Sequence, residues 1–76
     1  MNPKNIPVND FRRYLISKGL RHIRTNGSHE IWSRRDLLRP VVLQSNIDPV
    51  PVFIIKNNLR NMGETIADLI KFMSNK

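Results

Sequence analysis

Residues 24–32 read Arg24-Thr25-Asn26-Gly27-Ser28-His29-Glu30-Ile31-Trp32, and this stretch decides the fold. Asn-Gly is a strong signal for a two-residue hairpin turn, because tight turns need positive φ angles that these two residues adopt most easily. Apolar residues flank the pair on both sides. The stretch therefore predicts a β-hairpin, with strands at residues 20–25 and 28–33 and its turn at Asn26-Gly27.

A helix is predicted before the hairpin, over residues 7–18. Its apolar residues recur at spacings of three and four, which places them on one stripe. Asn9 or Asp10 can cap the start of this helix, and Gly19 provides the usual C-terminal stop.

A third strand and two further helices are predicted after the hairpin. The β-branched run within residues 38–44 indicates the strand. Asp48 fits the N-cap of a helix over residues 50–62, in which Phe53 widens the apolar stripe. The helix starts at Pro49 or at Pro51, and a last helix covers residues 65–74.

These elements predict one domain over residues 1–76, in the order helix, three strands, two helices. An α+β fold with a three-stranded antiparallel sheet and helices on one face is the economical arrangement. The chain has no cysteine, which excludes disulfides and thiolate chemistry. No apolar run reaches the length of a membrane span, and the N-terminus lacks a hydrophobic signal region, so we expect a cytoplasmic protein.

The charge balance indicates a polyanionic partner. Thirteen Lys and Arg residues against six Asp and Glu residues give a formal charge of +7. An excess of this size on a small domain favours nucleic acid. The alternatives are a solvated basic surface and a patch that docks an acidic protein. The acidic residues are scattered along the chain, which disfavours a two-metal phosphodiesterase site, and two histidines without a third ligand make a poor zinc site.

His29 is the first candidate for chemistry. RNA carries its own nucleophile, the 2′-hydroxyl, so a general base, a general acid and cations on the phosphate suffice for cleavage. Imidazole suits the proton transfer at neutral pH. The alternative is that His29 is an ordinary polar strand residue. His22 lies on the partner strand, where it either approaches His29 as a second acid or base or is merely half-buried.

The neighbours of His29 have simpler interpretations. Gly27 supplies backbone geometry at the turn. Ser28 faces away from His29 in a regular strand, so a Ser–His nucleophilic couple is disfavoured, and Ser28 caps the turn or donates a hydrogen bond to a phosphate. Trp32 faces away from His29, which favours a role as a core anchor, with base stacking as the alternative. A phosphate-binding surface is expected from the cations around the sheet, which are Lys18, Arg21, Arg24 and Arg39.

Taken together, several of these residues resemble the motif of the HicA-type toxins. The matching residues are Lys18-Gly19-Leu20, Arg24, Gly27-Ser28-His29 and Trp32. The order of elements is also similar, including a valine-rich third strand and a helix closed by Asn61-Met62-Gly63. The resemblance therefore spans nearly the whole chain. At Gln44-Ser45-Asn46 the chain departs from the many members that have a proline and a histidine there.

The resemblance implies a fold like that of double-stranded RNA-binding domains and the activity of an mRNA interferase. It implies RNA cleavage without a metal or other cofactor, and inhibition by a HicB-type antitoxin that covers the active site. His29 corresponds to the catalytic histidine of the family, with Gly27 and Ser28 as supporting neighbours. Arg24 matches the motif arginine. The rival interpretations are a non-catalytic RNA-binding module and a basic protein-interaction domain.

Overall fold

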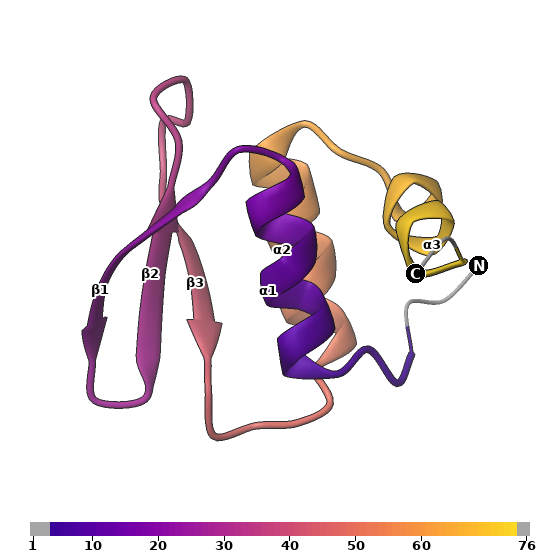
Figure 1. Cartoon of the computed structure of the whole chain (residues 1–76), viewed down its shortest axis with the longest axis horizontal. Coiled ribbons are helices and arrows are strands. Elements are labelled where there is room, and N and C mark those ends of the chain that lie inside the picture. The colour runs from indigo at the N-terminus through magenta and orange to yellow at the C-terminus, as the bar shows by residue number, and fades with distance from the viewer. Residues whose placement is uncertain (1–3, 75–76) are drawn as a thin grey trace.

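The computed structural model describes residues 4–74, which form three helices and one three-stranded antiparallel sheet. The elements follow in the order α1 (Val8–Ser17), β1 (Arg21–Asn26), β2 (His29–Ser33), β3 (Val41–Gln44), α2 (Val52–Met62) and α3 (Ile66–Ser74). The strands lie on one side of the molecule and the helices on the other, with β2 between β1 and β3 (Figure 1). The predicted α+β class and element order are confirmed.

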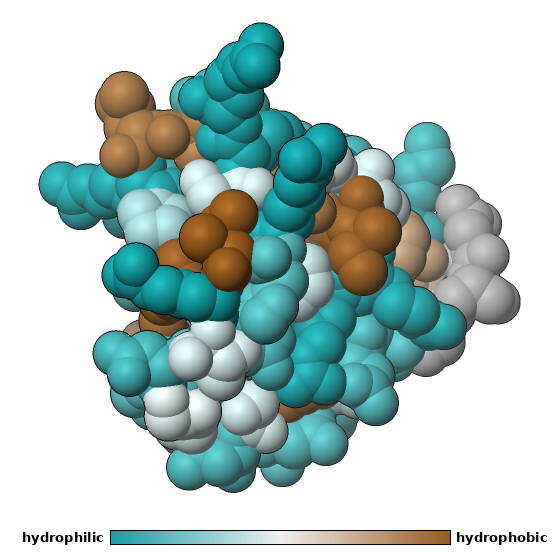
Figure 2. Space-filling view, turned by 60° about the vertical axis from the view of Figure 1, so that its left-hand side comes forward, coloured by the Kyte–Doolittle hydropathy of each residue, from teal (hydrophilic) through white to brown (hydrophobic). Residues whose placement is uncertain are grey.

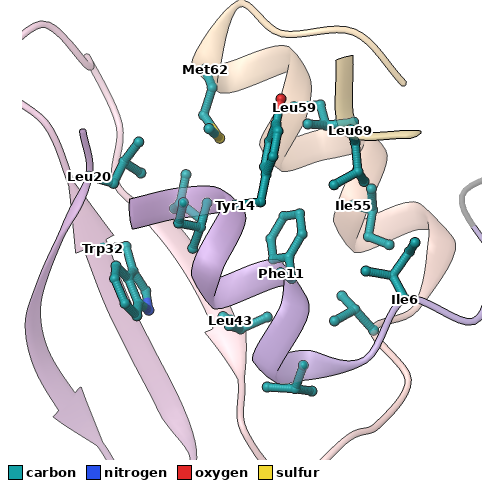
Figure 3. Packing of buried hydrophobic residues seen from close by; sticks show 14 residues of the cluster. Ile6, Phe11, Tyr14, Leu20, Trp32, Leu43, Ile55, Leu59, Met62 and Leu69 are labelled. Atoms are coloured by element: carbon teal, nitrogen blue, oxygen red, sulfur yellow. The ribbon is translucent and has the colours of Figure 1, made fainter. Parts of the chain in front are cut away.

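The core lies between the sheet and the helices. Phe11 and Tyr14 of α1 are fully buried at its centre, and Figure 3 shows the Tyr14 side chain beside Leu59 of α2. The ring of Phe72 from α3 meets Tyr14 edge-on at 5.3 Å between centroids, and the Tyr14 hydroxyl donates to Glu64 (3.1 Å). Burial and this bond raise the pKa of Tyr14. The sheet contributes Trp32, Val41 and Leu43.

The hairpin turn lies one residue later than predicted. Asn26 is still paired with His29, so the two loop residues are Gly27 and Ser28. Gly27 has φ +63°, and it occupies the first central position, where type II′ turns take glycine. An added Cβ there would meet nothing within 4 Å, so the backbone angle and not crowding accounts for the glycine.

A β-bulge between His22 and Arg24 breaks the alternation of β1. Regular alternation would place His22 and Arg24 on the same side of the strand. In the structure His22 is opposite Trp32, on the helix-facing side, and Arg24 is opposite Ile31 on the other side. The extra residue at the bulge reverses the sides of all following side chains.

The predicted N-caps of two helices are wrong, because Asp48 caps α1 and does not cap α2. Neither Asn9 nor Asp10 caps α1. The Val8 amide instead donates to the carboxylate of Asp48 (3.0 Å), forty positions along the chain. The predicted N-cap role of Asp48 at α2 is also wrong, since α2 begins after Pro51.

The third strand and α2 also differ from their predicted extents. β3 begins at Val41 and not at residue 38, directly after Pro40, whose nitrogen cannot donate to the ladder. On α2, Phe53 does not join the apolar stripe and is 65% exposed. The buried side of the helix is set by Ile55 and Leu59, and at 100° per residue Phe53 points roughly opposite to them.

Within residues 4–74, no helix has the length and apolar character needed to cross a membrane.

Candidate functional site

The sheet has one face against the helices and one open face. Directly paired residues point to the same side of a sheet, so the register assigns each side chain to a face. Glu30 and Trp32 are buried toward the helices, which leaves His29 on the open face. Figure 2, in which the sheet side comes forward, shows mainly hydrophilic side chains interrupted by separate apolar patches. The open face carries Arg21, Arg24, Asn26, His29, Ile31, Ser33, Val42 and Gln44.

His29 is held at the end of the sheet where two loops meet. It is the first residue of β2, is exposed, and is paired with Asn26 on one side and Gln44 on the other. The carbonyl of Ser28 accepts hydrogen bonds from both the amide (2.8 Å) and the hydroxyl (3.1 Å) of Ser45. These bonds tie the turn before His29 to the segment after β3, so the backbone on both sides of His29 is fixed.

Gln44 is the one side chain bonded to the His29 ring in the described part of the chain. Its amide nitrogen donates to Nε2 of His29 at 3.2 Å. With the Gln44 amide in this orientation, the bond requires Nε2 to be the acceptor, and this corresponds to the neutral tautomer with its proton on Nδ1. This contact orients the imidazole, and the neutral Gln44 amide does not itself exchange a proton.

Arg24 is the predicted cation that the structure brings to His29. Asn26 is paired with His29, and Arg24 is two residues away on the same face, which makes it the diagonal neighbour. Diagonal pairs are separated by about 7–8 Å between Cα atoms, within reach of an arginine side chain. Arg24 is exposed and has no carboxylate partner among residues 4–74. One phosphate can therefore contact both side chains.

The other predicted cations are dispersed. Arg21 shares the open face with His29 but is at its far end, opposite Ser33. Arg39 precedes β3, where its carbonyl accepts a bond from Asn61 of α2. Lys18 is on the helical side, with its ammonium 3.2 Å from Glu64 and 5.6 Å from the centre of the Tyr14 ring. The predicted surface is thus divided over several sides of the molecule.

The two histidines are not brought together. His22 is paired with Trp32 on the helix-facing side, and its ring is 5.4 Å from the Trp32 ring centre. Its Nε2 bonds the Thr25 hydroxyl at 2.7 Å. The structure therefore does not bring His22 and His29 together as an acid–base pair, and the alternative of a half-buried His22 is also wrong, because the residue is exposed.

Glu30 is the important residue that sequence reasoning missed. It follows His29 but is buried on the opposite face, where Arg12 of α1 bonds both carboxylate oxygens. The Trp32 indole N–H also donates to Glu30 (3.1 Å). The bond from Arg12, with the help of Trp32, lowers the pKa of Glu30. This cluster fixes β2 to α1 directly behind His29. Its sequence signal was the i, i+2 spacing to Trp32, which places both residues on one face.

In the part of the chain that the structure describes, the acidic side chains all have partners, whereas many of the basic side chains do not. Four carboxylates form ion pairs, with Arg12, Arg13, Lys18 and Arg34. The other two, Asp48 and Asp68, accept hydrogen bonds from backbone amides. The cations that have no ion pair within residues 4–74 are Lys4, Arg21, Arg24, Arg35, Arg39, Lys56, Arg60 and Lys71. No three His, Asp or Glu side chains in that range form a group that could hold a metal ion.

No protein-family model, curated protein or solved structure matches this chain.

Proposed function

We propose that this protein is an endoribonuclease that cleaves mRNA without a metal ion, with His29 as its general acid or base. The observation that carries the proposal is the position of His29. It is exposed on the open sheet face, bonded by Gln44 and diagonal to the unpaired Arg24. The resemblance to HicA-type toxins through Gly27-Ser28-His29 supports the same activity and a fold like that of double-stranded RNA-binding domains.

The chemistry needs few groups, because the substrate supplies the nucleophile. The 2′-hydroxyl attacks the adjacent phosphorus, the bond to the 5′-oxygen breaks, and a 2′,3′-cyclic phosphate forms. His29 takes the proton from the 2′-hydroxyl or gives one to the leaving oxygen. Arg24 faces the negative charge that grows on the phosphate oxygens. Gln44 holds the imidazole in position during the proton transfer.

A protein partner belongs to the proposal. We propose that the protein is the toxin of a toxin–antitoxin pair and that a HicB-type antitoxin covers His29. The unpaired cations of the open face, Arg21 and Arg24, suit an acidic inhibitor as well as RNA. A basic protein-interaction domain would use the same surface without binding RNA.

The proposal is tested by incubating 5′-labelled mRNA with the purified protein in EDTA and, in parallel, in magnesium. We expect the same fragments in both buffers, each ending in a 2′,3′-cyclic phosphate or its hydrolysis product. Intact RNA that is nevertheless retained by the protein would identify a non-catalytic RNA-binding module. Intact RNA without retention would identify a protein-interaction domain, and cleavage in magnesium alone would exclude the mechanism.

A further inference from the structure

An exposed aromatic side chain lies outside the site described above. Phe53 is 65% exposed on α2, and no other aromatic ring of residues 4–74 contacts it. Exposing a phenyl ring to water forgoes its burial energy. The core of α2 is complete without Phe53, since Ile55, Leu59 and Met62 are all buried.

Phe53 begins a row of exposed polar side chains along α2. Positions i, i+3, i+4 and i+7 lie on one side of a helix. Here they are occupied by Phe53, Lys56, Asn57 and Arg60, all exposed, which we call the α2 outer stripe. The helix has no acidic residue between Val52 and Met62. Neither Lys56 nor Arg60 has a carboxylate partner within residues 4–74, so both charges are available to an anion.

Arg39 extends the α2 outer stripe toward the sheet. The Asn61 side chain donates to the carbonyls of Arg39 (2.8 Å) and Pro40 (3.2 Å), and Asn58 donates to Val42 (3.1 Å). These bonds hold the outer edge of β3 against α2. Between the two elements they leave a shallow hollow of ≈ 570 Å³, lined by Arg39, Pro40, Asn57, Asn58, Arg60 and Asn61. Arg39 and Arg60, neither of which has an ion pair within residues 4–74, thus line the same hollow as the side-chain amide of Asn57.

We propose that the α2 outer stripe is a binding site for single-stranded RNA, in which Phe53 stacks on a base and Lys56, Arg60 and Arg39 contact phosphates. The inference rests on the proposed ribonuclease function and names the substrate form, a single strand. Stacking on an aromatic side chain next to cations is how single strands are bound without sequence preference. The bases of an A-form duplex are stacked on each other and do not offer a face to a phenyl ring.

The dimensions and the position of the stripe suit a short segment of the substrate strand. Phe53 and Arg60 are seven residues apart, about 10.5 Å along the helix axis. A site of this length contacts only a short segment of a strand. α2 begins at the same end of the molecule as the turn that precedes His29 (Figure 1). The α2 outer stripe therefore starts at the end of the molecule that carries His29, the first residue of β2.

The test measures binding of a labelled 12-nucleotide single-stranded RNA by the full chain carrying His29→Ala, which keeps the probe intact. Adding Phe53→Ala should raise the Kd roughly fivefold to hundredfold, the range for loss of one stacked base. Phe53→Trp should restore binding. The matched control is Ile16→Ala, which removes another exposed apolar side chain, 60% exposed on α1, and should leave the Kd unchanged. An abasic strand of the same length should bind the proteins with and without Phe53→Ala equally.

The outcomes separate this inference from the proposed function. If the His29→Ala protein does not retain RNA at low salt, the proposed function fails. If it retains RNA and Phe53→Ala does not change the Kd, the proposed function stands and the stripe is not an RNA site. If Phe53→Ala weakens binding of the abasic strand as much as binding of the RNA, Phe53 does not stack on a base. It would then act on the fold or on the positions of the charged side chains, and this result also overturns the inference.

Discussion

Replacement of His29 by alanine is expected to lower the single-turnover rate constant for RNA cleavage by about 10²–10⁴-fold, the usual contribution of one general acid or base. The loss is chemical, because the alanine side chain cannot exchange a proton with the 2′-hydroxyl or the leaving oxygen. Gln44, the neighbour that remains, is a neutral amide and cannot substitute. Cleavage of a labelled mRNA in EDTA under enzyme excess gives the rate constant.

Two controls make this result specific to His29. The side chain of His29 is exposed, so its removal should leave the melting temperature nearly unchanged. His22→Ala removes the other imidazole, which contacts Trp32 and Thr25 on the opposite face, and should retain most of the rate. Equal rates for wild type and His29→Ala, with both proteins folded, would remove His29 from the reaction.

Replacement of Glu30 by alanine is expected to cost about 2–4 kcal/mol in the free energy of unfolding. The substitution removes the carboxylate that pairs with Arg12, which keeps only its bond to Asn9, and leaves the Trp32 indole N–H without its acceptor. The whole free energy of unfolding of a small domain is only about 5 kcal/mol or somewhat more, so this loss is a large fraction of it. Urea unfolding followed by tryptophan fluorescence measures it. Asp36→Ala removes an exposed carboxylate that also pairs with an arginine, and should change stability little.

The contribution of Glu30 should also depend on pH in a defined direction. The pKa of Glu30 is lower in the folded protein than its usual value of 4.5. The carboxylate therefore stabilises the fold fully above that value, and its contribution is lost as the pH falls through the lower, folded value. The stability difference between wild type and Glu30→Ala should be constant from pH 7 to about pH 5 and shrink below it. A difference that grows on acidification would contradict the Arg12–Glu30 interaction.

Local signals were sufficient for the element order. Apolar spacings of three and four, the Asn26-Gly27 pair and the glycines after two helices depend only on neighbouring residues. They located every helix and strand within a few positions. The predicted start of the third strand was the least accurate boundary. The strand begins only after Pro40, because the proline nitrogen cannot donate to the ladder.

Features that depend on contacts between residues far apart in the sequence could not be predicted from local patterns. The Asp48 cap of α1 joins residues forty positions apart, so local patterns assigned Asp48 to the nearer helix. The bulge in β1 changes the face of Arg24, and no residue type in that strand marks it. His29 was predicted as the candidate residue from its turn and its chemistry, and that role stays a prediction. Its surroundings, with Gln44 beside it and buried Glu30 behind it, required the register of all three strands.

The most direct test of the central claim asks whether the 2′-hydroxyl of RNA is the nucleophile in a reaction without metal. One cleavage site in a labelled RNA is mapped, and the substrate is then synthesised with a single 2′-deoxynucleotide on the 5′ side of that bond. In EDTA, we predict that the wild-type protein no longer cleaves at the substituted bond and still cleaves the other sites of the same molecule. Undiminished cleavage at the substituted bond would contradict the mechanism, because the nucleophile would then come from elsewhere.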